Sequence, residues 1–126
     1  KVAVLELKKI LEEADVEAIV KEVERLDYFE DTIFISFNYE SLEILKKLRP
    51  EARAQFLIST FDDDLIDRLL ACDLDLDIHY KALTAENVAL CHEKGIRVNC
   101  WTVDDPAEAE KLIGYGVDYI TSNILE

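Results

Sequence analysis

The sequence has few of the residues and motifs on which several kinds of protein depend. Its 126 residues include no methionine, three glycines and two prolines. Because a translated protein begins with methionine, we expect Lys1 to be an internal position of a longer chain. A glycine-rich phosphate loop, a Ser-His-Asp arrangement and a Gly-x-Ser-x-Gly elbow are all missing from the sequence. Their absence excludes the enzyme classes that are built on these motifs.

Cysteine is also scarce. Cys72, Cys91 and Cys100 are odd in number and have no Cys-x-x-Cys spacing, which excludes both a disulfide framework and a zinc site of the usual spacing. We expect each of them to be a small core residue. Unpaired thiols favour a reducing compartment such as the cytosol, and nothing else in the sequence indicates a location.

Positive charge is in short supply, with 14 basic against 28 acidic residues and a formal net charge of −14. Binding to nucleic acid needs clustered Lys and Arg, so this class of partner is excluded. The most apolar runs, residues 32–37 and 54–58, are much shorter than the ~18 residues that span a bilayer. We therefore expect no membrane segment or signal peptide in residues 1–126, and a single packed domain.

Strand-like runs recur along the chain, most of them about twenty residues apart, and helical patterns of Val, Ile and Leu separate them. The predicted strands are residues 2–7, 32–37, 53–58, 74–80, 96–101 and 117–121. Asp62, Thr84 and Asp105 are the expected helix N-caps, and Gly95 and Gly116 follow the ends of helices. This alternation predicts an α/β fold of parallel βα units.

Polar and aromatic side chains end several of the predicted strands, where the active sites of parallel βα barrels are built. Glu6 and Lys8 share one face of the first strand, because side chains two residues apart point to the same side. A carboxylate directed into a barrel is costly unless it binds a cation or a partner. The alternative is a pair of neighbouring charges on a solvated edge.

Three further strand ends carry aromatic or imidazole side chains. Trp101, the single tryptophan, is either part of a binding pocket or a core aromatic, and Phe37 admits the same two interpretations. His79 follows an alternation of aspartates in residues 73–77. We favour a structural role for His79 over membership of a catalytic or metal cluster.

Several segments resemble the glycerophosphodiester phosphodiesterase family. GIRVNCWTV (residues 95–103), DDP (104–106) and GVDYIT (116–121) are similar to the last strands of that family. VLELK (4–8) is similar to its Ile-Glu-x-Lys strand, and Ser36-Phe37 to a Ser-Phe pair that closes a strand. At the C-terminal end, Ser122 and Asn123 depart from the family's Thr-Asp or Thr-Asn followed by Pro.

The resemblance implies an incomplete (βα)8 TIM-type barrel that lacks the first strands, because a complete one takes about 250 residues. It implies a hydrolase of lipid metabolism that splits glycerophosphodiesters into glycerol 3-phosphate and an alcohol with the help of Mg²⁺ or Ca²⁺. Glu6 would be a metal ligand, Lys8 would bind the substrate phosphate, and Trp101 and Phe37 would contact the glycerol moiety. The family's two catalytic histidines belong to a His-Arg-Gly motif and a His-Asp pair, which this sequence lacks.

A rival interpretation is a non-catalytic half-barrel that acts by binding or by assembling with another chain. Open sheet edges invite pairing, so this interpretation predicts a homodimer formed through exposed strands. A His-Arg-Gly segment upstream of Lys1 would favour the enzyme, whereas a natural start near Lys1 would favour the module.

Overall fold

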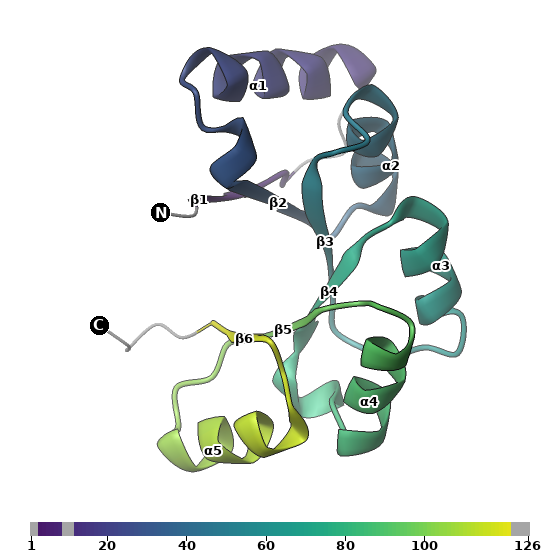
Figure 1. The fold of residues 1–126 in the computed structure, drawn as a ribbon, viewed down its shortest axis with the longest axis vertical. Coiled ribbons are helices and arrows are strands. Elements are labelled where there is room, and N and C mark those ends of the chain that lie inside the picture. The colour runs from purple at the N-terminus through teal and green to yellow at the C-terminus, as the bar shows by residue number, and fades with distance from the viewer. Residues whose placement is uncertain (1–2, 9–11, 122–126) are drawn as a thin grey trace. The chain divides into compact units, whose positions relative to one another are not determined.

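Strands and helices alternate throughout the chain (Figure 1). The computed structural model describes residues 3–8 and 12–121. It divides into two compact units: an N-terminal unit of residues 1–57 with 72–74, and a C-terminal unit of residues 58–71 with 75–126. Within the described residues, no helix has both the length and the apolar character that crossing a membrane demands.

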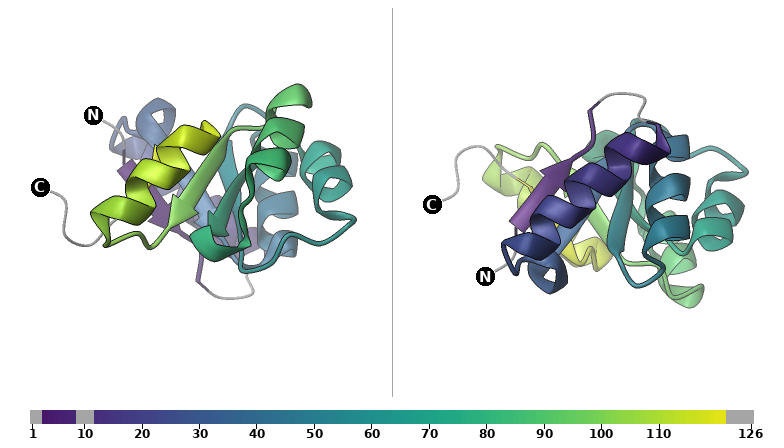
Figure 2. Two further views of the ribbon diagram at one scale, coloured as in Figure 1. Left: turned by 90° about the horizontal axis from the view of Figure 1, so that it is seen from below. Right: turned by 90° about the horizontal axis from the view of Figure 1, so that it is seen from above.

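The N-terminal unit contains three parallel strands in the order of the sequence. Its strands are β1 (Ala3–Glu6), β2 (Thr32–Ser36) and β3 (Arg53–Ile58), and its helices are α1 (Glu13–Arg25), the 3-10 turn η1 (Phe29–Asp31) and α2 (Tyr39–Leu48). Helices α1 and α2 pack against each other (Figure 2). The register places Glu6 opposite Ile35 and Ser36 opposite Phe56, which brings the carboxyl ends of the strands to a common edge of this unit.

Apolar spacing explains why the helices of the N-terminal unit form where they do. Val16 and Val20 of α1 are four residues apart and 1% exposed, and Leu42 and Leu45 of α2 are fully buried. Asn38 caps α2, because its side-chain oxygen accepts a hydrogen bond from the Ser41 N–H at 2.8 Å. These helices therefore cover the strand face that carries Phe34 and Phe56, both of which are buried.

The C-terminal unit repeats the pattern with three further parallel strands, again in sequence order. Its elements are α3 (Leu65–Cys72), β4 (Asp75–His79), the 3-10 turn η2 (Tyr80–Ala82), α4 (Ala85–Glu93), β5 (Val98–Trp101), α5 (Pro106–Tyr115) and β6 (Tyr119–Ile120). Helices α4 and α5 contact each other. The strands are one to three residues shorter than predicted, except β3, and Val2 lies outside the described residues.

Two of the three predicted helix caps are confirmed. The Thr84 hydroxyl accepts a hydrogen bond from the Asn87 N–H at 3.1 Å, and the Asp105 carboxylate accepts one from the Ala107 N–H at 3.0 Å. The prediction for Asp62 is wrong, because α3 begins only at Leu65 and Asp62 belongs to the preceding turn, where its carbonyl accepts the Leu65 N–H.

Glycine ends two helices in the C-terminal unit, as the sequence predicted. Gly116 caps α5 with φ at 91°, and Gly95 follows α4 with φ at 79°. Both values lie in the left-handed region that glycine adopts without a steric penalty. The chain can therefore turn directly from each helix toward the next strand.

Candidate active site

The carboxyl ends of the strands carry the side chains that the sequence singled out. Glu6 is the last residue of β1, His79 of β4 and Trp101 of β5, while Lys8 and Phe37 follow strand ends closely. We call the end of the first two strands (Glu6, Leu7, Lys8, Ser36 and Phe37) the β1–β2 rim. The end of the next pair (Asp77, His79, Tyr80 and Trp101) is the β4–β5 rim. Ser122 and Asn123 lie outside the described residues.

The β1–β2 rim presents a carboxylate and an ammonium group on side chains with different exposure. Glu6 is half-buried at the end of β1, and Lys8 is exposed two residues later. Between them, Leu7 is 3% exposed, and its N–H still donates to the Ile35 carbonyl at 2.7 Å. Strand pairing thus continues past the formal end of β1 and anchors the backbone between the two charged residues.

Ser36 holds this rim together in a way that the sequence reasoning did not find. Its side chain is fully buried, and its hydroxyl donates a hydrogen bond to the Leu7 carbonyl at 2.7 Å. The same hydroxyl accepts the Asn38 N–H at 2.9 Å. One side chain therefore joins the segment after β1 to the start of α2. The sequence signalled Ser36 as a small hydroxyl residue at the end of a mostly apolar strand and as part of the Ser-Phe pair, but neither signal indicates its partner.

Phe37 is exposed although it directly follows the buried Ser36. Its exposed fraction is 55%, which is large for an aromatic side chain next to a packed strand. A phenyl ring that is this exposed at a strand end can contact a ligand, so its exposure is compatible with the predicted role. The contact with glycerol itself stays a prediction.

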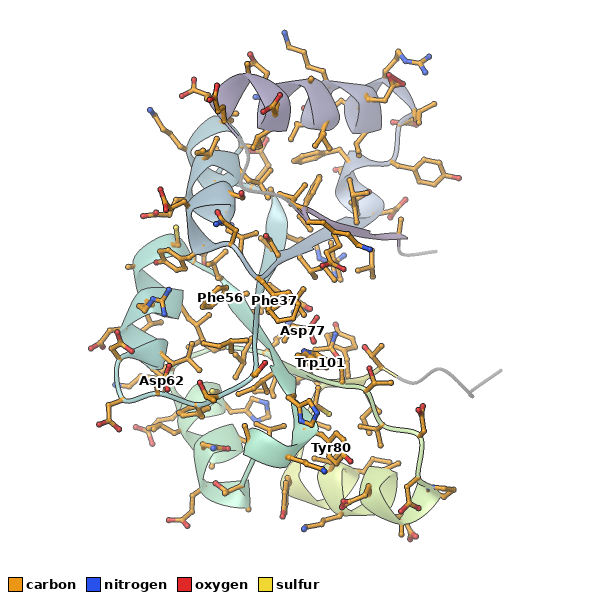
Figure 3. All side chains as sticks on the ribbon, turned by 180° about the vertical axis from the view of Figure 1, so that it is seen from behind. Phe37, Phe56, Asp62, Asp77, Tyr80 and Trp101 are labelled. Atoms are coloured by element: carbon orange, nitrogen blue, oxygen red, sulfur yellow. The ribbon has the colours of Figure 1, made fainter. Side chains whose placement is uncertain are left out.

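Three rings pack together at the β4–β5 rim. The His79 imidazole stacks on Tyr80, with centroids 5.0 Å apart and an interplanar angle of 18°. The same imidazole meets Trp101 edge to face, at 5.0 Å and 81°. Trp101 Nε1 also donates a hydrogen bond to the Asp77 carbonyl at 3.1 Å. Figure 3 shows Asp77, Trp101 and Tyr80 in succession toward η2.

The contacts of His79 give it a definite structural task. Its Nδ1 accepts the Lys81 N–H at 3.2 Å, so in the neutral ring Nε2 carries the proton. The ring is half-buried between Tyr80 and Trp101. This packing is compatible with the structural role that the sequence favoured, which stays a prediction.

Strands β4 and β5 have a polar face below this rim. Asp77 is 4% exposed and pairs in register with Asn99, while His79 pairs with Trp101 one layer above. The opposite face of β5 carries Cys100, which is fully buried. Burial, and secondarily the charge of Asp77, raises the pKa of the Cys100 thiol from 9.0 to about 11. The thiol is therefore protonated at neutral pH, as expected of a core cysteine.

Glu6 is the one residue that the sequence assigned to a metal ion. Mg²⁺ and Ca²⁺ take six or more oxygen ligands, and a half-buried carboxylate at a strand end is a suitable one. Within residues 3–8 and 12–121, no group of three or more His, Cys, Asp or Glu side chains is arranged to hold a metal. Glu6 thus fits one position of such a site, which would need further ligands from outside the described residues.

Comparison with known proteins relates this geometry to a family. The chain matches the glycerophosphoryl diester phosphodiesterase family over residues 3–125. It is 28% identical over 108 residues to a glycerophosphodiester phosphodiesterase of Caldanaerobacter subterraneus subsp. tengcongensis. The aligned region covers 85% of this chain and 44% of that protein. The chain therefore spans about half the length of such relatives.

Solved structures agree in fold. A glycerophosphodiester phosphodiesterase from Parabacteroides distasonis superimposes with a TM-score of 0.84 at 30% identity, over 96% of this chain and 52% of that one. A phosphodiesterase from Oleispira antarctica, solved with its product sn-glycerol-3-phosphate, has a TM-score of 0.75 at 28% identity, over 91% and 49%. The predicted class, parallel βα units of an incomplete TIM-type barrel, is thereby confirmed. With the match over residues 3–125, the chain belongs to the glycerophosphoryl diester phosphodiesterase family.

Proposed function

We propose that this chain forms the later strands of an enzyme that hydrolyses glycerophosphodiesters to glycerol 3-phosphate and an alcohol. The family match over residues 3–125 carries the proposal. Further support comes from the Oleispira antarctica relative, which binds sn-glycerol-3-phosphate as its product. The polar and aromatic residues at the carboxyl ends of β1 and β5 are of the kinds that such a reaction needs.

The β1–β2 rim would contribute charged groups that bind the substrate phosphate and a cation. We assign Lys8 to the phosphate of the substrate, because its exposed ammonium group can stabilise negative charge that develops on the phosphoryl oxygens. Glu6 would hold Mg²⁺ or Ca²⁺ as one of several oxygen ligands. When bound, such a cation would neutralise part of the charge on the phosphate. Phe37 would pack against the carbon atoms of the glycerol moiety.

The β4–β5 rim would contribute a wall of the pocket that binds the glycerol moiety. Trp101 is half-exposed, and its indole is held by the bond to the Asp77 carbonyl and by the edge of His79. A ring fixed in this way can form one wall of a glycerol pocket at little cost in conformational entropy. General acid and base groups are still needed, and by the family resemblance these are two histidines that residues 1–126 do not supply.

A direct assay separates this chain from the complete enzyme. A protein that carries residues 1–126 together with the remaining barrel strands should release glycerol 3-phosphate from a glycerophosphodiester, and a chelator should abolish the activity. Residues 1–126 alone should show no turnover above background, because acid–base catalysis typically supplies ~10²–10⁴-fold. Clear turnover by this chain alone would mean that His79 or another described group is catalytic.

The metal assignment needs a variant of its own. Glu6→Gln preserves the shape of the side chain but removes its charge, so activity should fall sharply and recover in part at a higher cation concentration. Glu93→Gln is a matched control, because Glu93 is exposed at the end of α4. If the metal dependence of the Glu6 variant equals that of the parent, Glu6 is not a ligand.

One observation favours the rival, a non-catalytic module that self-associates. Val4 on β1 and Tyr119 on β6 are 61% and 41% exposed, and each lies on a terminal strand of its unit. Exposed strand edges can pair with a second copy of the chain. Light scattering on residues 1–126 tests this: a dimer that Val4→Lys converts to monomer would support the module, and a monomer at high concentration would remove it.

A further inference from the structure

A small cavity opens between the η2 turn and α5, entirely within the C-terminal unit. Its volume is about 160 Å³. Tyr80, Lys81 and Leu83 line it from the β4–α4 connection, and Glu108, Lys111 and Tyr115 line it from α5. We call it the η2–α5 cavity. Pockets for drug-sized ligands occupy ~300–1,000 Å³, so this one suits a polar group of a few heavy atoms.

The charge around the cavity differs in sign from that of the chain. Acidic residues outnumber basic ones two to one overall, but two of the six lining residues named above are lysines and one is a glutamate. Lys81 and Lys111 are exposed, and neither takes part in an ion pair recorded among the described residues. The cavity is therefore a locally cationic place on an acidic protein, which favours an anionic group.

Aromatic rings give the cavity its walls. Lys111 Nζ lies 6.0 Å from the centroid of the Tyr115 ring, a distance at which the π-face attracts an ammonium group. Leu83 is 6% exposed and provides an apolar base. The Lys111 ammonium group thus lies near the Tyr115 ring, and Lys81 lines the same cavity, so a carboxylate bound there can form charge-assisted hydrogen bonds.

Tyr80 connects the cavity to the β4–β5 rim. Its side chain lines the cavity and also stacks on His79 at 5.0 Å, and His79 meets Trp101 at 5.0 Å. Only the imidazole of His79 therefore separates Tyr80 from the wall that we assign to the glycerol moiety. Ring contacts are therefore continuous from the lining of the cavity to Trp101.

We propose that the η2–α5 cavity binds the alcohol moiety of the diester and selects alcohols that carry a carboxylate. This inference rests on the proposed function. Lys81 and Lys111 bind the carboxylate, Tyr80 and Tyr115 enclose the carbon atoms, and Glu108 accepts an amino group where the alcohol has one. A serine-type alcohol meets all three requirements, whereas ethanolamine differs from it by the carboxylate alone.

That pair of alcohols provides the test. The complete protein is assayed with glycerophosphoserine and glycerophosphoethanolamine, and kcat/KM is compared. We expect the parent to prefer the serine diester, and Lys81→Gln with Lys111→Gln to lower kcat/KM for it about tenfold while the ethanolamine diester changes less than twofold. Lys94→Gln is the matched control, because it removes the same charge from an exposed lysine outside the cavity.

A serine-to-ethanolamine ratio that is the same in the double variant, the control and the parent would overturn the inference. If the parent hydrolyses neither diester, it is the proposed function that fails. Calorimetric titration of the same proteins then measures the Kd of each diester and tests whether the cavity binds the carboxylate. A preference in Kd that the double variant loses supports the cavity assignment, and equal Kd values for both diesters in the parent overturn it.

Discussion

The β1–β2 rim and the β4–β5 rim hold their side chains by different means. At the first rim, the backbone between Glu6 and Lys8 is held by the buried Ser36 hydroxyl, which donates a hydrogen bond to the Leu7 carbonyl. At the second, His79 contacts both Tyr80 and Trp101, and the rings fix one another. The first rim is organised through the main chain and the second through side-chain packing.

This difference follows from the chemistry of the groups involved. A charged side chain remains solvated, so packing cannot fix it, and its position depends on the backbone that carries it. Aromatic rings gain dispersion energy and favourable edge-to-face electrostatics from each other, and this packing positions them together with the hydrogen bond from Trp101 to the Asp77 carbonyl. A rim that offers charge therefore depends on a buried hydrogen bond, and a rim that offers shape depends on its own rings.

The largest effect should come from removing the charge of the first rim. Lys8→Ala in the complete protein should lower kcat by about 10²–10³, the typical effect of losing one donor that stabilises developing negative charge. The dependence on metal concentration should not change, because this charge acts on the phosphate. Lys21→Ala, an exposed lysine on α1, is the control. A Lys8 variant as active as the control would remove the functional assignment of this residue.

Strand β5, which carries Trp101, should be sensitive to alkali through Cys100 on its opposite face. Burial raises the pKa of Cys100 in the folded state to about 11, so the protonated thiol stabilises the fold below pH 9 and this stabilisation is lost as the pH rises from about 9 to 11. The loss amounts to about 2–3 kcal/mol for a shift of this size. Denaturant unfolding between pH 8 and 11 should therefore show a flatter pH profile for Cys100→Ala than for the parent. Identical profiles would contradict the prediction.

A matched pair of donor deletions tests the contrast between the rims directly. Ser36→Ala leaves the Leu7 carbonyl without this donor, and Trp101→Phe does the same to the Asp77 carbonyl. Each should reduce the free energy of unfolding by about 1–3 kcal/mol. Only Ser36→Ala should also reduce the effect of Lys8→Ala in a double-mutant cycle, because it loosens the backbone next to Lys8. Ser59→Ala, at an exposed serine after β3, is the control. Equal coupling of both deletions to Lys8 would refute the distinction.

The smallest effect is expected at the amino end of β5. His92 Nε2 lies 2.7 Å from Asp118 Oδ2, which also accepts the Val98 N–H at 2.7 Å. Because both side chains are about one-third exposed, His92→Gln should cost only about 0.2–1 kcal/mol of stability. Activity of the complete protein should not change, since this pair is at the other end of the strand from Trp101. A large loss of activity would show that the two ends of β5 are coupled.

Much of the fold could be predicted from local sequence patterns. Thr84, Asp105 and Gly116 mark helix ends through local hydrogen bonds and backbone conformation, and these signals do not depend on distant parts of the chain. The prediction for Asp62 failed because three successive aspartates offer alternative caps, and the packing of Leu65 and Leu69 decided where α3 begins.

The sequence by itself determined the alternation of strands and helices, the family and the identity of Glu6, Lys8, Phe37 and Trp101 as candidates. Only the tertiary structure assigned Ser36 to the Leu7 carbonyl, 29 residues away, and His79 to Trp101, 22 positions further along the chain. It alone brought Lys81 and Lys111 to one cavity. Local patterns record what each segment prefers, whereas contacts between distant segments depend on strand register and on helix packing, which no single segment encodes.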